Sequence, residues 1–280
     1  MPRTLGVTRV GRSELRWGER TYIMGIVNVT PDSFSGDGLG GDVKAALEQA
    51  RRFADEGADI IDVGGESTRP GAQPVDLEEE RRRVLPSIER IAAAVSVPVS
   101  VDTYKAQIAR EAIAAGAAMI NDVWGLKKDA RLAEAASAAG VPLVLMHNQE
   151  TREYAGLLAD IVRSLGKSVE QAKAAGVRWE NIIVDPGIGF GKTKEHNLEV
   201  MRRLRELRVL GRPILLGASR KSTIGLVLDL PPGQRLEGTA ATVAIGIANG
   251  ADIVRVHEVR EMARVARMAD AIVRFGVEGG

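Results

Sequence analysis

The 280-residue chain contains no cysteine. Disulfide bonds, thiolate nucleophiles and cysteine-based metal sites are therefore excluded. Only three histidines are present, and no two of them stand at the spacing of a metal-binding pair. The sequence also lacks a G-x-x-x-x-G-K-S/T phosphate loop, a G-x-S-x-G nucleophile elbow and a dinucleotide-binding glycine fingerprint. We therefore do not expect covalent catalysis by a side chain of the protein.

The chain has little net charge and no long apolar run. The formal net charge is +1, and 45% of the residues are hydrophobic and 27% charged, which is typical of an ordinary soluble protein. This balance gives no reason to expect nucleic acid or an anionic membrane surface as a partner. The first ten residues carry charge without an apolar signal core, and no later run approaches membrane-spanning length. We expect a cytoplasmic protein.

A strand, a loop and an amphipathic helix repeat along the chain. Residues 3–20 alternate apolar and polar positions around two glycines and predict a short N-terminal β-hairpin within residues 1–20. Strands are predicted to start near Tyr22, Ile60, Pro98, Ala118, Pro142, Ile182, Pro213 and Ile253. Helical periodicity predicts helices over 42–57, 76–95, 104–115, 129–139, 157–175, 194–209, 235–249 and 258–275.

Glycine stands before nearly every predicted return to a strand, as expected at helix C-termini; the positions are Gly57, Gly116, Gly140, Gly176, Gly211 and Gly250. No Ser/Pro-rich linker interrupts the series. Eight strand-helix units in about 250 residues favour a closed α/β fold, a (β/α)8 TIM barrel over residues 22–275. An open doubly wound sheet is the alternative, but its edge strands would usually be more polar. The whole chain is thus predicted to be one domain.

Polar residues end most of the predicted strands: Asn28, Asp62, Asp102, Asn121, His147, Asp185 and His257. Each places a polar group at the end of a buried segment, which costs free energy. Seven such strand ends in one chain are therefore hard to ascribe to chance. In a TIM barrel these ends meet at one rim, where active sites lie. The clearest case is Asp185, which is followed by a loop with three glycines and Phe190.

Four of the predicted rim residues could bind a planar heterocycle by hydrogen bonds to its edge: Asp102, Asn121, Asp185 and Lys221. Carboxylates accept hydrogen bonds from N–H groups, and a lysine donates to a carbonyl. The alternative is a structural role, in which the two acids cap helices or pair with the lysine. Four such groups at four strand ends favour the binding site, because buried ion networks seldom stabilise a fold by themselves.

A cationic group is predicted at the last two strands, where barrels often bind phosphate. Ser219 and Lys221 follow the seventh strand, and Arg255 and His257 end the eighth just before a helix N-terminus. His257 could instead only cap that helix. Asn28 offers a neutral oxygen to Mg²⁺ whose other ligands are water and phosphate oxygens, although a lone Asn is more often a turn residue.

Two long glycine-rich loops follow the first two strands, over 28–41 and 64–72, with Thr68 and Arg69 at the tip of the second. They are typical of lids that order over a substrate, or they are simple insertions. Met146 and His147 end the fifth strand. Met146 is predicted to pack against a ligand, whereas His147 is equally well explained as a satisfied core histidine.

Together these segments resemble dihydropteroate synthase. The motifs that carry the resemblance lie at 28–35 (NVTPDSFS), 64–71 (GGESTRPG), 101–103 (VDT), 120–123 (INDV), 145–147 (LMH), 185–192 (DPGIGFGK), 219–221 (SRK) and 254–257 (VRVH). The resemblance implies a TIM-barrel transferase, usually homodimeric. Such an enzyme condenses 6-hydroxymethyl-7,8-dihydropterin diphosphate with 4-aminobenzoate in folate biosynthesis and is inhibited by sulfonamides.

The resemblance also implies roles for individual residues. The pterin would be held by Asp102, Asn121, Met146, Asp185 and Lys221. Diphosphate would be bound by Asn28, Thr68, Arg69, Arg255 and His257, with Asn28 also on Mg²⁺. The aminobenzoate site would comprise Thr68, Arg69, Phe190, Ser219 and Lys221. Catalysis is expected to depend on Asp102, Lys221, Arg255 and His257, mainly through stabilisation of the leaving diphosphate.

Two other functions remain open from the sequence. A methyltetrahydrofolate methyltransferase that works with a corrinoid protein would share the acidic pocket, but it has no need of the Ser-Thr-Arg-Pro loop or of Arg255 and His257 as diphosphate ligands. A catalytically silent pterin-binding paralogue is the second alternative. The presence of Lys221, Arg255 and both loops argues against it.

Overall fold

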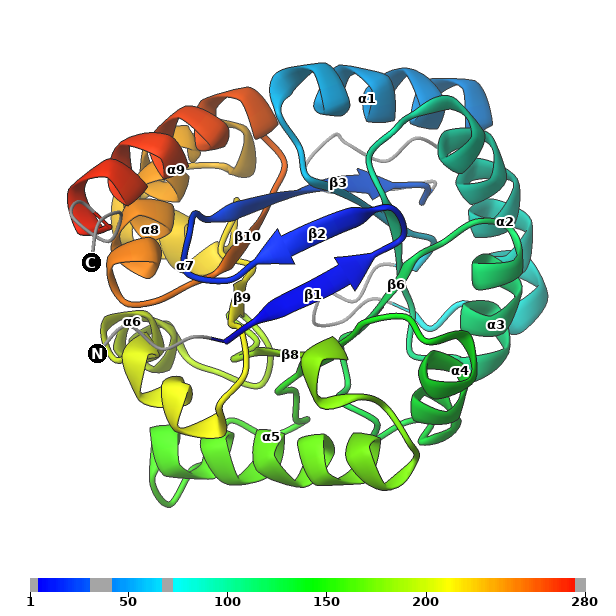
Figure 1. Cartoon of the computed structure of the whole chain (residues 1–280). Helices are drawn as coiled ribbons and strands as arrows, with labels where there is room; N and C mark the ends of the chain where they lie inside the picture. Colours follow the sequence, from blue (N-terminus) through cyan, green and yellow to red (C-terminus); the bar gives the residue numbers. More distant parts are fainter. Residues whose placement is uncertain (1–4, 31–41, 67–72, 275–280) are drawn as a thin grey trace.

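The structure is a computed structural model, and it describes residues 5–30, 42–66 and 73–274. A ring of parallel strands lies inside a layer of helices, and a two-stranded hairpin crosses one opening of the ring (Figure 1). The ring strands are β3 (Tyr22–Asn28), β4 (Ile60–Gly64), β5 (Val99–Asp102), β6 (Met119–Asp122), β7 (Leu143–Met146), β8 (Ile182–Asp185), β9 (Leu215–Leu216) and β10 (Ile253–Val256).

The helices of the outer layer are α1 (Val43–Glu56), α2 (Leu77–Ala94), α3 (Ala106–Ala114), α4 (Arg131–Ala139), α5 (Leu157–Ala174), α6 (Lys194–Arg202), α7 (Ser222–Leu228), α8 (Leu236–Ala248) and α9 (Val259–Val273). Short 3₁₀ helices cover Trp179–Asn181, Leu204–Leu210 and Pro232–Gln234. In the part of the chain that the structure describes, no helix is both long and apolar enough to span a membrane.

The strands pair in the order β8-β7-β6-β5-β4-β3-β10-β9. A parallel bridge between Val184 and Ile214 joins β8 to the segment that leads into β9 and closes the ring. The predicted (β/α)8 TIM barrel with an N-terminal hairpin is therefore confirmed. The assignment of the whole chain to one domain stays a prediction.

Local sequence explains where the first helix begins and ends. The Asp42 side chain accepts hydrogen bonds from the backbone N–H groups of Lys44 and Ala45, which have no partner within the helix. Gly57 ends the helix at a φ of 101°, in the left-handed region that glycine adopts readily. Both ends were predicted from these residue types.

Alternate residues of each strand point into the barrel. Near the strand starts the inward residues are apolar and form one cluster, which includes Met24, Ile60, Met119, Val144, Ile183, Leu215 and Ile253. Two positions further along four of these strands, the inward residues are Asp62, Asn121, Asp185 and Arg255. The barrel interior thus changes from apolar to charged along its axis, and the charged layer lies at the carboxyl ends.

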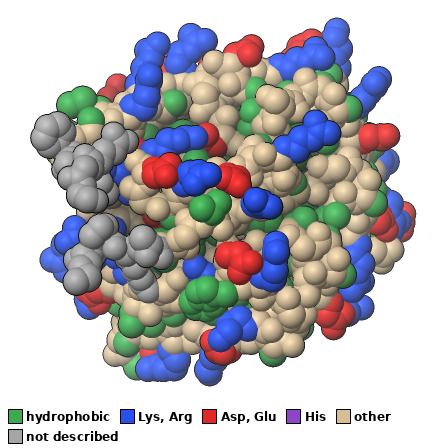
Figure 2. Space-filling view, viewed as in Figure 1, with side chains coloured by type: hydrophobic (Ala, Val, Ile, Leu, Met, Phe, Trp, Pro, Cys, Tyr) green, Lys and Arg blue, Asp and Glu red, His purple; other side chains and the backbone are tan. Residues whose placement is uncertain are grey.

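The hairpin, formed by β1 (Val7–Val10) and β2 (Ser13–Arg16), covers the amino ends of the strands. Val10, Leu15 and Trp17 are buried in the same cluster as the apolar strand starts. On this face basic and acidic side chains are intermixed (Figure 2). The hairpin therefore seals one end of the barrel and leaves the carboxyl ends for the site.

Two predicted features differ from the structure. The helix predicted over 194–209 stops at Arg202 and continues as the 3₁₀ helix Leu204–Leu210, in which the buried Leu204 and Leu207 follow the three-residue period. Helix α7 was not predicted. Three consecutive apolar residues, Leu226 to Leu228, are exposed in it, so the segment lacks the amphipathic period by which helices are recognised.

Candidate active site

An arginine between two carboxylates lies in the mouth of the barrel. Arg255 Nε donates to Asp62 Oδ2 at 2.6 Å, and Arg255 Nη2 donates to Asp102 Oδ2 at 2.7 Å. Asn121 Nδ2 donates to the same Asp62 oxygen at 3.0 Å. Burial lowers the pKa of Arg255, but the two carboxylates outweigh it and hold the pKa above its usual value. One charged network thereby links β4, β5, β6 and β10.

Two acceptors of this network have no hydrogen-bond partner among the described residues. They are Asp62 Oδ1 and Asp102 Oδ1, and both atoms are buried. Burial raises the pKa of Asp102 to about 7, and the opposing pull of Arg255 only partly offsets it. Buried acceptors normally have a partner, so these oxygens are suited to the N–H groups of a bound molecule.

Asp185 provides a second carboxylate at the end of β8. Its Oδ1 accepts a hydrogen bond from Gly187 N at 2.7 Å, so the side chain is fixed by the loop that follows it. Burial raises the pKa of Asp185 to about 6, while the Gly187 N–H and the charge of Lys221 oppose the rise. The side chain is only slightly exposed, yet it lies where the barrel opens.

An apolar wall stands beside these charges. Val123, Met146 and Phe190 form a small buried cluster, against which Tyr104 and Trp124 are packed. Lys221 Nζ lies 4.2 Å from the centroid of the Phe190 ring, a cation–π contact. Acceptors, a cation and flat apolar surface together suit a planar heteroaromatic ligand.

Ser219 and His257 meet across the ends of the last two strands. The distance from Ser219 Oγ to His257 Nδ1 is 2.9 Å, and the His257 backbone N–H donates to the same hydroxyl at 3.2 Å. The neighbouring Glu258 accepts a hydrogen bond from Arg220 Nε at 2.5 Å. The residues that the resemblance assigned to aminobenzoate and to diphosphate are therefore in contact here.

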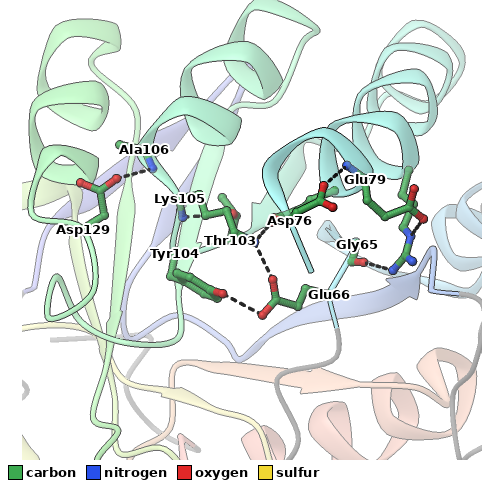
Figure 3. Close-up of polar contacts among 11 residues, drawn as sticks. Gly65, Glu66, Asp76, Glu79, Thr103, Tyr104, Lys105, Ala106 and Asp129 are labelled. Atoms are coloured by element: carbon green, nitrogen blue, oxygen red, sulfur yellow. Dashed lines mark hydrogen bonds and ion pairs between the residues drawn. The ribbon is translucent and has the colours of Figure 1, made fainter. Parts of the chain in front are cut away.

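The second glycine-rich loop is anchored where it leaves β4 (Figure 3). Tyr104 OH donates to Glu66 Oε1 at 2.9 Å, and Lys105 Nζ donates to Glu66 Oε2 at 2.5 Å. Lys105 also pairs with the buried Glu80. Burial lowers the pKa of Lys105, but its hydrogen bonds to the two glutamates raise the pKa by more. The pKa of Lys105 is therefore above its usual value. The exit of β4 is thus tied to α2 and to the residues just after β5.

The structure does not describe all of the predicted site residues. Thr68 and Arg69 are outside the described residues, as are residues 31–41 of the first loop. Asn28 is the last residue of β3 and stands in register with Gly64 of β4. In the described parts of the chain, no group of three or more histidine, aspartate or glutamate side chains could hold a metal ion.

Comparisons with known proteins agree with this geometry. Residues 24–257 match the family described as pterin binding enzyme. A dihydropteroate synthase from Clostridium beijerinckii is 55% identical over 267 residues, which cover 95% of this chain and 99% of that protein. The chain belongs to the dihydropteroate synthase family of pterin-binding enzymes. The resemblance and the transferase class predicted from the motifs are thereby confirmed.

Solved structures of this family have the same fold. A Clostridium difficile dihydropteroate synthase in the presence of pteroic acid has a TM-score of 0.88 and 52% identity, covering 92% of this chain and 98% of that one. A Yersinia pestis enzyme with a sulfonamide drug complex has a TM-score of 0.91 and 40% identity, covering 95% of this chain and 99% of that one. A Xanthomonas albilineans enzyme with 4-aminobenzoic acid has a TM-score of 0.89 and 41% identity, covering 95% of this chain and 97% of that one.

The structure brings most of the predicted rim residues to one end of the barrel. Sequence reasoning placed Asp62 at a strand end but assigned it no role, although it is the acceptor shared by Asn121 and Arg255. Its position in the series of polar strand ends was the available signal. Contacts of Lys105 and of Lys192 were also missed, because their partners lie up to 45 positions away in the sequence.

Proposed function

We propose that the chain condenses 6-hydroxymethyl-7,8-dihydropterin diphosphate with 4-aminobenzoate to give 7,8-dihydropteroate and diphosphate in folate biosynthesis. The observation that carries the proposal is the pair of buried carboxylates, Asp102 and Asp185, beside Lys221 and the apolar wall. The names of the related enzymes support the same reaction.

The pterin lies across the barrel mouth. Asp185 and Asp102 accept hydrogen bonds from its N–H groups, Asn121 adds an amide, and Lys221 donates to its carbonyl oxygen or a ring nitrogen. The bond from Asn121 Nδ2 to Asp62 orients the amide so that its oxygen faces the other way. Met146 packs against the flat ring.

The reaction replaces a C–O bond to diphosphate with a C–N bond to the arylamine. The C–O electron pair leaves with the diphosphate, and the arylamine nitrogen attacks the methylene carbon and then loses a proton to solvent. The amine is uncharged at neutral pH, so no base has to act first. Stabilisation of the leaving group therefore governs the rate, and a dissociative substitution is expected.

Arg255 and His257 bind the diphosphate in this scheme. The bonds of Arg255 to Asp62 and Asp102 use Nε and Nη2, so its Nη1 edge is the part assigned to a phosphate oxygen. His257 stands at the start of α9, where helix N–H groups favour an anion. Asp102 stabilises the positive charge that develops on the dihydropterin ring.

Asn28 fits a magnesium ion whose other ligands are mostly diphosphate oxygens and water. A carboxamide oxygen at the rim is a hard donor, and Mg²⁺ commonly takes only one or two protein ligands beside a phosphate. When bound, the ion would offset negative charge on the leaving diphosphate. Thr68 and Arg69 complete the diphosphate site in the proposal.

The 4-aminobenzoate site is assigned to Phe190, Ser219 and Lys221, with Thr68 and Arg69. Lys221 contacts the Phe190 ring, and Ser219 stands two residues before Lys221 in the chain and contacts His257. Sulfonamides, which resemble aminobenzoate in shape and charge, bind here as competitors. The Yersinia pestis complex with a sulfonamide supports this part.

The chain forms a homodimer through α7 and α8 in our proposal. Large apolar side chains are exposed on these neighbouring helices: Leu226, Val227, Leu228, Leu236 and Ile245. A cluster of this kind is typical of an interface. The proposed place of action is the cytoplasm, because a pterin diphosphate carries several negative charges and does not cross membranes unaided.

The decisive experiment is diphosphate release from the pterin diphosphate with and without 4-aminobenzoate. Release that depends on the arylamine, with 7,8-dihydropteroate as the second product, is expected. Corrinoid-dependent methyl transfer instead would establish the methyltransferase alternative. Pterin binding without either reaction would establish the silent paralogue.

A further inference from the structure

The buried Lys192 donates hydrogen bonds to the backbone of the glycine-rich loop that follows β8. Lys192 is 5% exposed, and its Nζ lies 3.0 Å from each of three acceptors: Gly187 O, Phe190 O and His147 Nδ1. A protonated lysine has three N–H donors and no acceptor. The three donors therefore have three partners, and two of them are backbone carbonyls of one loop.

The loop is pressed against the end of β7 and can only be built from glycine at two positions. Gly187 has a φ of 70°, and a Cβ atom there would lie 1.9 Å from His147 O. Gly191 has a φ of 54°, and its Cβ would lie 2.4 Å from Gln149 O. Such a loop has few side chains of its own to hold it, so its shape depends on hydrogen bonds to its backbone.

Phe190 carries one of the two carbonyls that Lys192 binds. It belongs to the apolar wall with Met146 and contacts Lys221. The backbone of Asp185, in contrast, is held by the sheet, where it is in register with Met146 of β7, and its side chain meets the loop at Gly187 N. Loss of the hydrogen bonds from Lys192 to the loop should therefore move Phe190 much more than Asp185.

We infer that Lys192, together with His147, is a positioning residue that sets the Phe190 wall for the arylamine substrate. The inference rests on the proposed function for the identity of that substrate. Lys192 does not touch the reacting atoms. It acts through the carbonyls of Gly187 and Phe190, and the wall residue that this loop carries, Phe190, is the one assigned to the benzoate ring, whereas Met146 of β7 is assigned to the pterin.

The protonation of the pair is compatible with this role. Burial lowers the pKa of Lys192 to about 7; Asp185 raises it, and Lys127 and Lys221 lower it further. Burial and the charge of Lys192 lower the pKa of His147 to about 2, so the imidazole is neutral. A neutral lysine would accept from His147 Nδ1–H and keep two donors for the carbonyls. Either form can hold the loop.

The test is Lys192→Met, which keeps the chain length and removes every donor. Steady-state kinetics should show the KM for 4-aminobenzoate raised about tenfold or more, as expected when charged hydrogen bonds to the loop are lost. The KM for the pterin diphosphate should change less than about threefold. Lys127→Met is the matched control, because Lys127 donates to Asn148 O and makes no hydrogen bond to residues 187–191 in the part of the chain that the structure describes.

Two further measurements separate positioning from mere stabilisation. In a Phe190→Ala background, Lys192→Met should add little to the aminobenzoate constant, because both changes act on the same wall. If Lys192→Met does not fold, Lys192→Gln is the second variant. Its side chain is shorter but keeps two N–H donors, so its KM for 4-aminobenzoate should exceed that of the wild type. Thermal melts of each variant show whether the protein is folded.

An unchanged aminobenzoate constant in folded Lys192→Met, an equal rise for both substrates, or full additivity with Phe190→Ala would overturn the inference. These outcomes are read in an enzyme whose wild type is active. An inactive wild type would contradict the proposed function instead. Calorimetric affinity for 7,8-dihydropteroate gives a readout that is independent of turnover, and Lys192→Met should weaken it.

Discussion

The two ends of the barrel use opposite chemistry. At the amino end, the hairpin packs Leu15 and Trp17 onto apolar strand starts, and Trp17 Nε1 donates to Thr8 Oγ1 at 2.9 Å. At the carboxyl end, Asp62 Oδ1 and Asp102 Oδ1 are buried with no hydrogen-bond partner among the described residues. The sealed end pairs Trp17 with Thr8 beneath an apolar cover, and the open end keeps carboxylate acceptors for a ligand.

This difference separates stability from function within one sheet. Apolar burial stabilises the fold by about 25 cal/mol per Å². Buried carboxylates with raised pKa values contribute nothing comparable and are typical of functional sites. Changes at the sealed end should therefore lower stability without altering substrate affinity, and changes at the open end should do the reverse.

The largest expected effect is at the sealed end. Leu15 is 2% exposed, and Leu15→Ala should lower the free energy of unfolding by about 2–5 kcal/mol through the cavity it leaves. Urea denaturation measures the loss, and steady-state kinetics on the folded variant should give unchanged KM values. A large change in KM would show that the two ends are coupled.

Asp185→Asn reverses the pattern at the open end. The amide accepts more weakly than a carboxylate, and its NH₂ group would face a donor of the pterin. Pterin affinity should fall by roughly 2–4 kcal/mol, the range for losing one charged partner in a buried site. Calorimetric titration measures this. Unchanged pterin binding would remove Asp185 from the site, and a large loss of stability would break the comparison.

The sequence predicts the open end better than its internal contacts. Asp102, Asn121 and Asp185 were predicted because a parallel barrel gathers its strand ends at one rim, a rule that needs no knowledge of pairing. The bridge from Arg255 to Asp62 spans 193 positions. No local pattern encodes such a pair, so the roles of Asp62 and of Lys192 required three-dimensional structure.

The helices show the same limit. Periodicity predicts a helix only when one face is buried. It found α1 and α9, each with buried and exposed residues in turn, but not α7, whose exposed Leu226 to Leu228 break the pattern. Lys221 was therefore expected to follow a strand, whereas in the structure it also opens this short helix.

His257→Ala sharpens the comparison within the open end. If His257 stabilises charge that grows as diphosphate leaves, kcat should fall about tenfold to a hundredfold. Affinity for a pterin without diphosphate should stay the same. His196→Ala is the control, since His196 belongs to the capping box of α6 and should affect stability more than turnover. Equal losses in kcat and in pterin affinity would contradict the role of His257.

The smallest effect expected is a pH dependence confined to the open end. Burial raises the pKa of Asp185 from its ordinary value to about 6, so below that pH the empty site holds a proton that a ligand N–H must displace. Pterin affinity should fall by about tenfold, or about 1.4 kcal/mol, for each pH unit below 6. Calorimetry in two buffers of different ionisation enthalpy should register proton release.

The folded protein binds this proton more tightly than the unfolded chain, so Asp185 contributes a stability that decreases as the pH rises from about 4 to about 6. Leu15→Ala should retain both trends, whereas Asp185→Asn should reduce them to the part that Asp102 contributes, because burial also raises the pKa of Asp102, to about 7. An affinity that is constant from pH 8 to pH 5 would mean that Asp185 does not meet the pterin as a carboxylate.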